Sequence, residues 1–228
     1  MARYRSRRYQ ESATKVERSK RYPLEEGISL IKSLAGPKFD ESVELVVRIG
    51  IDPKKTDQLV RGSVALPNGT GKSIKIAVFA DGDKAQAAKD AGADYVGAAD
   101  LAEKIEKGFT DFDMTIASPD MMRFVGKLGK VLGPQGKMPS PKAGTVTPNV
   151  ADAVREFKAG KIEFRTDAGA NVHAAIGKKS FGEVELSQNL TAFVEHLRTL
   201  RPSQAKGAFI KKVVLSTSMG PGVALAVE

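Results

Sequence analysis

The hydrophobic pattern of this chain changes twice, and these changes constrain its fold more than any other feature. Near both ends, helical spacings are mixed with alternating strands such as Val43 to Ile49. Between the turn-rich residues 67–71 and 159–160, short apolar strands alternate with helices, which is typical of a small parallel sheet. Neither end segment is long enough to bury a sheet face alone. We therefore predict a discontinuous α+β terminal domain, residues 1–67 and 160–228, with an inserted α/β domain, residues 68–159.

The same periodicities predict individual elements. Helices are expected over 24–35, 81–91 with Asp81 or Asp83 as N-cap, 100–107, from Ser118 onward, 149–158, and around the apolar positions 186–200. Strands are expected over 43–49, 61–66, 76–80, 95–96, 112–117, 161–165, 172–178, 209–217 and 223–227. We expect 172–178 to pair with 161–165. Residues 126–148 contain five glycines and four prolines, so they predict a long loop that is either functional or disordered.

Composition excludes several classes of protein. The 228 residues include no cysteine and only two histidines, which rules out disulfide frameworks, thiolate metal sites, cysteine nucleophiles and histidine-rich metal centres. No apolar run approaches the roughly 18 residues of a membrane span, and the basic N-terminus lacks the apolar stretch of a secretory signal. We expect a cytoplasmic protein with no membrane partner and no cofactor.

Positive charge is concentrated in three clusters. The chain carries 36 Lys and Arg against 27 Asp and Glu, a net charge of +9. The clusters are the N-terminal arm (1–23), residues 123–142, and the pairs Lys178-Lys179 and Lys211-Lys212. One such run is usually a solvated surface. Three separate runs favour a nucleic-acid partner.

Three segments resemble motifs found in enzymes, but none of them matches its motif in full. Gly69 to Ser73 resembles the end of a phosphate-binding loop, but Leu66 stands where the first glycine is required and a strand follows. The glycines at 126, 129 and 133 follow a helix, so they do not form a dinucleotide fingerprint. Asp111 and Asp113 are expected to be turn and capping residues.

Other residues have two interpretations each. For His196 we expect packing on a helix surface, and for His173 either strand packing or an RNA contact. A lone Phe39 is by default a core residue. Residues 216–221 form either a simple hairpin turn or a hydroxyl-rich surface for folded RNA.

Four motifs, in order along nearly the whole chain, resemble the bacterial L-one family of large-subunit ribosomal proteins. They are Lys38–Val43, Gly50–Pro53 with Gln58–Gly62, Gly133–Pro139 with Pro141–Val146, and Ser216–Gly220. The resemblance implies a discontinuous terminal domain with an inserted Rossmann-like three-layer α/β domain. It implies a non-enzymatic constituent of the ribosome, monomeric there, that binds the stalk region of large-subunit rRNA. It also implies contact with deacylated exit-site tRNA and repression of the protein's own operon mRNA.

The resemblance and the charge clusters together give candidate contact residues. Those expected at rRNA are Arg3, Arg5, Arg7, Arg8, Lys38, Phe39, Ser42, Arg165, Asp167, Lys178, Lys179, Lys212, Ser216, Thr217, Ser218, Met219 and Gly220. Those expected at tRNA or a second RNA are Arg123, Lys127, Lys130, Lys137 and Lys142. Ser42 and Ser218 stand where many relatives have threonine, and they keep the hydroxyl. Lys212 stands where some relatives have serine.

Two alternatives remain at this stage. One is a small-molecule enzyme with its site at the strand ends of the inserted domain. The other is a stand-alone mRNA-binding repressor. The sequence contains no catalytic nucleophile, metal site or phosphate loop, which favours the structural RNA-binding protein without a small-molecule substrate.

Overall fold

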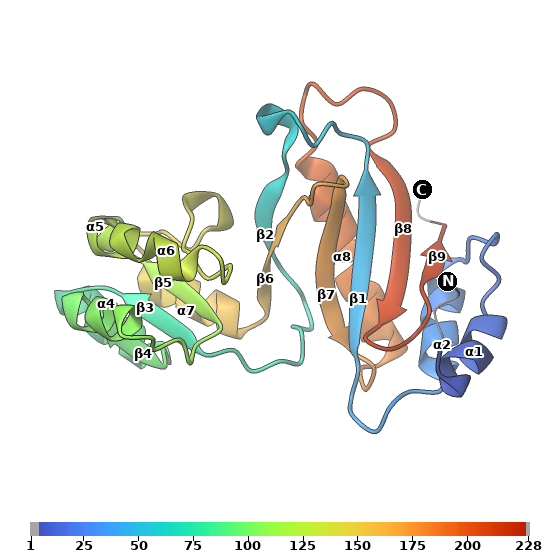
Figure 1. Ribbon diagram of the computed structural model, residues 1–228, viewed down its shortest axis with the longest axis horizontal. Coiled ribbons are helices and arrows are strands. Elements are labelled where there is room, and N and C mark those ends of the chain that lie inside the picture. The colour runs from blue at the N-terminus through green and yellow to red at the C-terminus, as the bar shows by residue number, and fades with distance from the viewer. Residues whose placement is uncertain (1–4, 227–228) are drawn as a thin grey trace. The chain divides into compact units, whose positions relative to one another are not determined.

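The computed structural model describes residues 5–226, except for the side chain of Thr56, and is a mixed α/β protein (Figure 1). The chain divides into two compact units. Unit 1 comprises the chain up to Gly71 and from Ile162 onward, and unit 2 comprises Lys72–Lys161. Each of the two crossings therefore lies a few residues beyond the position expected from the turn residues. Among the described residues, no helix is long and apolar enough to cross a bilayer.

Unit 1 is built around a four-stranded antiparallel sheet of order β7-β1-β8-β9. Its elements are α1 (Arg7–Thr14), α2 (Leu24–Ser33), β1 (Ser42–Ile49), η1 (Thr56–Gln58), β2 (Arg61–Ala65), β6 (Lys161–Arg165), β7 (Asn171–Lys178), α8 (Glu183–Thr199), β8 (Ile210–Thr217) and β9 (Val223–Leu225). The expected pairing of 172–178 with 161–165 is wrong. Strand β7 pairs with β1, and β6 pairs with β2. Thr166 and Val172 keep a single antiparallel bridge.

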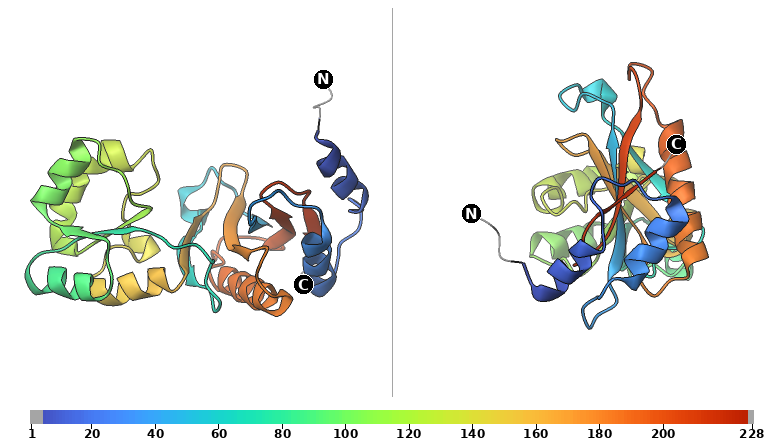
Figure 2. Two further views of the ribbon diagram at one scale, coloured as in Figure 1. Left: turned by 90° about the horizontal axis from the view of Figure 1, so that it is seen from below. Right: turned by 90° about the vertical axis from the view of Figure 1, so that its right-hand side faces the viewer.

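Helices α2 and α8 cover one face of this sheet (Figure 2). The alternation in β1 explains why, because Val43, Leu45 and Val47 are fully buried against apolar side chains of both helices. The α8 positions 186, 190, 193 and 197, spaced for one helix face, are buried there as well. The opposite face of the sheet carries Glu44, Val46 and Arg48 of β1, which are exposed or half-buried. We call this opposite side the open face.

Unit 2 is built around a three-stranded parallel sheet of order β4-β3-β5. Its elements are β3 (Ile76–Phe79), α3 (Gly82–Asp90), β4 (Tyr95–Gly97), α4 (Ala99–Glu106), β5 (Met114–Ala117), η2 (Pro119–Met121), α5 (Met122–Val125), η3 (Gly126–Leu128), α6 (Gly129–Leu132), η4 (Pro141–Ala143) and α7 (Val150–Lys158). Alternate residues of β3 serve two separate cores: Ile76 and Val78 pack with α3 and α7, and Ala77 and Phe79 pack with α4 and α5. Asp81 caps α3 as expected, since its carboxylate accepts a hydrogen bond from the Gly82 amide (2.8 Å).

Two segments are more helical than their composition predicts. Residues 126–148 are not one long loop: Leu128 and Leu132, four residues apart, are fully buried and anchor the short turns η3 and α6. Val146 then forms a parallel bridge with Ala117 beside β5. In the basic arm, the Ser6 hydroxyl accepts a hydrogen bond from the Tyr9 amide (3.3 Å) and starts helix α1.

Candidate nucleic-acid interface

Three segments that are far apart in the sequence meet at one end of the unit 1 sheet. They are the α2–β1 loop (36–41), the β7–α8 loop (179–182) and the β8–β9 turn (218–222), which lie together at the lower end of the sheet in Figure 1. The Ser218 amide donates to the Ser42 carbonyl (3.1 Å), and the Lys179 amide donates to the Glu41 carbonyl (2.8 Å). We call this surface the recognition end. Its members are Lys38, Phe39, Ser42, Lys178, Ser218, Met219 and Gly220.

A buried carboxylate, Glu41, connects the three segments. It is only 2% exposed, and its Oε1 accepts a hydrogen bond from the Met219 amide (2.9 Å). Its Oε2 lies 3.9 Å from Lys179 Nζ. Lys179 Nζ also donates to the Leu34 carbonyl at the end of α2 (2.5 Å). Glu41 therefore fixes the β8–β9 turn against the loop that carries Lys38 and Phe39.

Sequence reasoning did not identify Glu41, and it assigned Lys179 differently. An acidic residue before a strand carries no signal of burial, because its partner Lys179 follows it by more than a hundred residues. Lys179 was expected at rRNA, but its ammonium group is directed into the protein, with only 19% of its side chain exposed. The structure gives Lys179 a role in shaping the recognition end.

Hydroxyl and ammonium groups at the recognition end form a connected network. Lys178 Nζ donates to the Ser42 hydroxyl (2.9 Å), and the Ser42 amide donates to the Ser218 hydroxyl (3.2 Å). Ser218 is exposed, while Lys178 and Ser42 are half-buried. Such a fixed group of donors and acceptors suits the phosphates and 2′-hydroxyls of folded RNA.

Two apolar side chains project into solvent beside this network. Phe39 is 57% exposed and Met219 is 52% exposed, so the default placement of Phe39 in the core is wrong. Exposing apolar side chains to water costs free energy, which is recovered when a partner covers them. Unstacked RNA bases are one such partner, because they stack on aromatic side chains.

The β8–β9 turn is a tight hairpin whose shape depends on Gly220. The Gly220 amide donates to the Thr217 carbonyl (3.2 Å), and a Cβ at position 220 would overlap the Thr217 hydroxyl. Thr217 itself is buried (5% exposed), and its side chain packs against Gly220 on the inner side of the turn. Ser216 is half-buried on the open face of β8.

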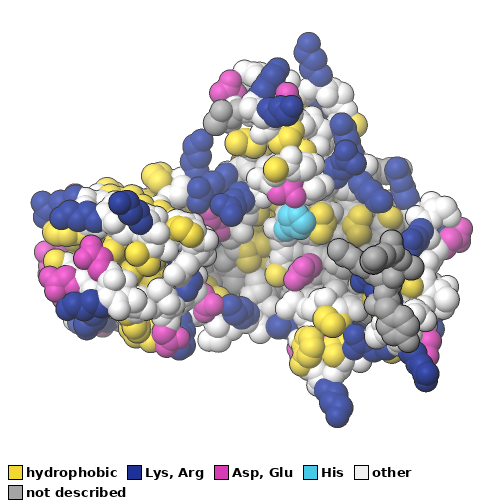
Figure 3. Space-filling view, viewed as in Figure 1, with side chains coloured by type: hydrophobic (Ala, Val, Ile, Leu, Met, Phe, Trp, Pro, Cys, Tyr) yellow, Lys and Arg dark blue, Asp and Glu magenta, His cyan; other side chains and the backbone are white. Residues whose placement is uncertain are grey.

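The open face continues from the recognition end along the strands, and Figure 3 shows it with charged and apolar side chains side by side. The strand register places Val46 between His173 and Val214, and Arg48 opposite Lys212. Two cations directly opposite each other destabilise a sheet pair unless an anion lies near them. This part of the sheet therefore favours an anionic ligand.

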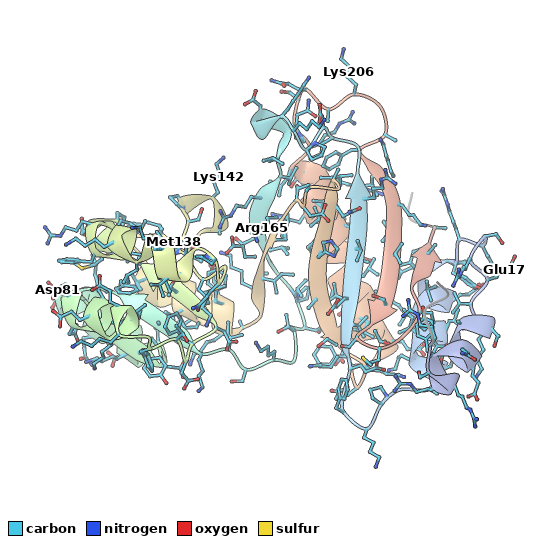
Figure 4. All side chains as sticks on the ribbon, viewed as in Figure 1. Glu17, Asp81, Met138, Lys142, Arg165 and Lys206 are labelled. Atoms are coloured by element: carbon cyan, nitrogen blue, oxygen red, sulfur yellow. The ribbon has the colours of Figure 1, made fainter. Side chains whose placement is uncertain are left out.

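The side chain of Arg165 is free to meet a ligand in solvent, whereas that of Asp167 is bonded within its own turn. Arg165, labelled in Figure 4, ends β6 with an exposed side chain. Asp167 organises its own turn: its carboxylate accepts hydrogen bonds from the amides of Asn171 (2.7 Å) and Gly169 (2.8 Å) and lies 3.2 Å from His173 Nε2. The bonds from Asn171, with smaller contributions from His173 and Gly169, lower the pKa of Asp167 to about 2.

The arm residues lie on or beside α1. Arg7 is exposed, Arg8 is half-buried, and the Arg5 guanidinium lies 4.7 Å from the centre of the Tyr9 ring. Arg3 lies outside the described residues. Arg7 in the first turn of α1 and Arg5 just before the helix are therefore both exposed to solvent.

In unit 2, four of the five predicted basic contacts are exposed and one is not. Arg123, Lys127 and Lys130 follow one another along α5, η3 and α6, and Lys142 points into solvent from η4 (Figure 4). Lys137 is half-buried: its Nζ donates to the Thr110 carbonyl (2.9 Å) and lies 5.0 Å from the centre of the Phe112 ring. The ammonium group of Lys137 therefore makes contacts inside unit 2 instead of facing solvent.

Asp111, Asp113 and His196 each make local contacts that explain their positions without a catalytic role. Asp113 accepts hydrogen bonds from Lys72 Nζ (2.7 Å) and the Lys75 amide (3.0 Å), and both lower its pKa. The bond from Lys75 Nζ likewise lowers the pKa of Asp111. His196 packs edge-on against Phe164, as expected for a helix surface. Within residues 5–226, no group of three or more acidic or histidine side chains is arranged to hold a metal ion.

Comparison with known proteins gives one consistent result. Residues 30–221 match the Ribosomal protein L1p/L10e family. The chain is 57% identical over 219 residues to "Large ribosomal subunit protein uL1" of Thermosipho africanus, covering 96% of this chain and 94% of the relative. It is 52% identical to the protein of that name from Kosmotoga olearia (97% and 96% covered) and 56% identical to that from Bordetella pertussis (95% and 94%). The resemblance drawn from the four motifs is confirmed, and the chain belongs to the ribosomal protein L1p/L10e family.

Proposed function

We propose that this protein is a structural constituent of the large ribosomal subunit and that the recognition end of unit 1 binds the stalk region of large-subunit rRNA. Membership of a ribosomal protein family indicates a structural rather than an enzymatic protein. The observation that carries the proposal is the convergence of three distant segments around Glu41, which presents Phe39 and Met219 beside the Ser42–Lys178–Ser218 network. The proposed place of action is the cytoplasmic ribosome.

In this proposal the two kinds of surface have different tasks. Exposed cations supply affinity by releasing counterions from RNA, which makes binding sensitive to salt. The shaped apolar and hydroxyl surface supplies selectivity, because it fits one RNA form and not another. We also propose that units 1 and 2 act as two domains, a discontinuous rRNA-binding domain and an inserted Rossmann-like one.

Filter binding with one substitution and a matched control tests the recognition end. Met219→Asp places a carboxylate where RNA is expected, and it should reduce affinity for a stalk-junction RNA at least tenfold. Val184→Asp is the control, because Val184 is 68% exposed at the start of α8 and tolerates an acidic residue there. Equal affinities for the two variants would refute the recognition end as the binding surface.

For unit 2 we propose a contact with exit-site tRNA through Arg123, Lys127, Lys130 and Lys142. Their exposure along α5, η3, α6 and η4 supports this role. Replacing these four residues with glutamine should remove protection of deacylated tRNA on ribosomes and leave rRNA binding by unit 1 unchanged. Unchanged tRNA protection in that variant would contradict this role.

Repression of the protein's own operon mRNA is proposed as a second use of the recognition end. An mRNA structure that imitates the stalk junction would bind the same surface, so the two RNAs should compete. A translational reporter should lose repression with Met219→Asp and keep it with Val184→Asp. Repression that survives Met219→Asp would separate this activity from the recognition end.

A further inference from the structure

The end of the unit 1 sheet opposite the recognition end carries a second cationic surface. The loop after β1 (50–58) and the loop before β8 (201–209) lie together there, at the upper end of the sheet in Figure 1. The Gly50 amide donates to the Phe209 carbonyl (2.6 Å), and a Cβ on Gly50 would lie 3.1 Å from Lys211 Cε. We call Lys54, Lys55, Lys206 and Lys211 the basic pole.

The four lysines of the basic pole form no ion pairs with carboxylates among the described residues. All four side chains are exposed, and Figure 4 shows Lys206 pointing into solvent. Within residues 5–226, none of the four ammonium groups pairs with a carboxylate, whereas Lys72, Lys75, Lys84, Lys158 and Lys161 all do. Residues 201–212 contain four basic and no acidic residues. The like charges of residues 201–212 favour a polyanion nearby, whereas Lys54 and Lys55 share their loop with the exposed Asp52 and Asp57.

The shape of the 201–209 loop is held by one of its own cations. The Arg201 guanidinium donates to the carbonyls of Ala205 and Gly207 (3.0 Å each), which orders the segment that carries Lys206. On the other loop, Gln58 accepts a hydrogen bond from the Asp52 amide (2.8 Å) behind Lys54 and Lys55. The lysines are therefore presented on two braced loops, which reduces the entropy lost when they bind a ligand.

The basic pole is continuous with the open face. Arg48 and Lys212, which lie opposite each other, stand between the pole and the middle of the sheet. Figure 3 shows several basic side chains, with a few acidic ones among them, at this end of the unit and further basic ones on the adjoining sheet. Strand β1 has eight residues, so the basic pole and the recognition end are about 25 Å apart along the strand, at roughly 3.3 Å per residue.

We propose that the basic pole binds the phosphate backbone of a second segment of the same RNA, which runs along β1 across the open face from the recognition end. This inference rests on the proposed rRNA binding and adds a second contact to it. Phosphate contacts fix orientation without reading sequence. The basic pole thus sets the direction of the RNA on the sheet, while the recognition end selects it.

Salt-dependent binding tests the proposal with a charge-matched control. The variant Lys54→Gln, Lys55→Gln, Lys206→Gln should lower the slope of log affinity against log salt by about 2 to 3, roughly one per lost phosphate contact. The control Lys89→Gln, Lys104→Gln, Lys107→Gln changes net charge equally on exposed positions of unit 2, and its slope should match wild type. Melting temperatures of both variants verify that they are folded.

Shortening the RNA separates a positioned contact from a general effect of charge. On a fragment too short to extend about 25 Å from the recognition end, wild type and the Lys54/Lys55/Lys206 variant should have equal slopes. Equal slopes on the long RNA, or an equal loss on both RNAs, would overturn the proposal. Failure of wild type to prefer stalk-junction RNA over a scrambled duplex would instead overturn the proposed function.

A tethered cleavage reagent locates the contact directly. The chain has no cysteine, so Lys206→Cys carries an iron chelate at a single position. Hydroxyl radicals generated there should cut the long RNA at nucleotides away from those protected by the recognition end, and Lys104→Cys should not cut there. Absence of cutting from position 206 in a complex that still binds selectively would overturn the proposal.

Discussion

At the scale of single residues, the buried Glu41 positions exposed groups of the candidate interface. It holds Met219 through a backbone amide and faces Lys179, while Lys179 holds the end of α2. Gly36 leaves room for this carboxylate, since a Cβ there would lie 2.9 Å from Glu41 Oε2. The exposed contacts are thus positioned by a buried pair.

Substitution of Glu41 should therefore affect stability and RNA binding together. Glu41→Ala removes the negative charge that faces Lys179 and the acceptor of the Met219 amide, and should lower the free energy of unfolding by about 3 kcal/mol. Urea unfolding measures this change. The control Glu44→Gln, on the open face of strand β1, which follows Glu41, should change it by less than about 0.5 kcal/mol. A Glu41→Ala protein as stable as this control would contradict the role given to Glu41.

The lowered pKa of Asp167 predicts that the stability of the fold depends on pH in the acidic range, below about pH 4. Its pKa is about 2 in the folded protein, below its ordinary value of 3.8, because Asn171 donates to the carboxylate. A lowered pKa gives stability that is present above about pH 4 and is lost as pH falls toward 2. Asp167→Asn should flatten the dependence of the melting temperature on pH between 4 and 2. An unchanged profile, equal to that of the surface variant Asp57→Asn, would show that the turn does not hold the ionised carboxylate.

At the scale of elements, helix α8 hydrogen-bonds both to strand β7 of the sheet and to residues 68–69, just before the chain passes from unit 1 to unit 2. Its Asn189 is fully buried and uses its whole amide: Oδ1 accepts from the Asn68 amide (3.0 Å), and Nδ2 donates to the carbonyls of Gly69 (2.9 Å) and Ile176 (2.8 Å). A buried amide with complete partners fixes one arrangement of the chain around it.

Removing this side chain should be costly. Asn189→Ala leaves three backbone groups without partners and creates a small cavity, so the free energy of unfolding should fall by about 3 kcal/mol. Chemical denaturation with a fluorescent or circular dichroism signal measures it. The neighbouring exposed position gives the control, Gln188→Ala, which should cost less than about 1 kcal/mol. Equal costs for the two variants would contradict the account.

The elements also show what could be predicted from the sequence. Periodicity placed α8 and strands β1, β3 and β8 correctly, because one apolar face determines each of them. It did not predict the pairing of β7 with β1 or the short turns around Leu128 and Leu132. Both depend on contacts between distant segments, and glycines in 126–136 concealed the two buried leucines.

The candidate site was predictable to the same extent. Charge clusters and the family resemblance brought forward Lys38, Phe39 and Met219, which the structure places together and exposed. The same reasoning treated Lys137 and Lys179 like other lysines, because burial of an ammonium group depends on its surroundings in three dimensions. Glu41 and the four lysines of the basic pole required the structure.

At the scale of the whole molecule, division into two units predicts that unit 1 carries rRNA binding alone. The three segments of the recognition end and their hydrogen-bond partners all belong to unit 1. Replacing residues 72–161 by a short glycine-rich linker should leave a cooperatively folding protein whose affinity for stalk-junction RNA stays within about tenfold of the full chain. A folded protein of this kind that had lost selective binding would place essential contacts in unit 2.

The most direct test of the central claim is the affinity ratio of the wild-type protein for stalk-junction RNA and a scrambled duplex of equal length, measured across salt concentrations. Cationic contacts weaken for both RNAs as salt rises, but contacts of Phe39, Met219 and the Ser42 and Ser218 hydroxyls do not depend on counterion release. The account predicts a large ratio that persists when the individual affinities fall. A ratio near one at every salt concentration would show that binding is purely electrostatic and would contradict the recognition end.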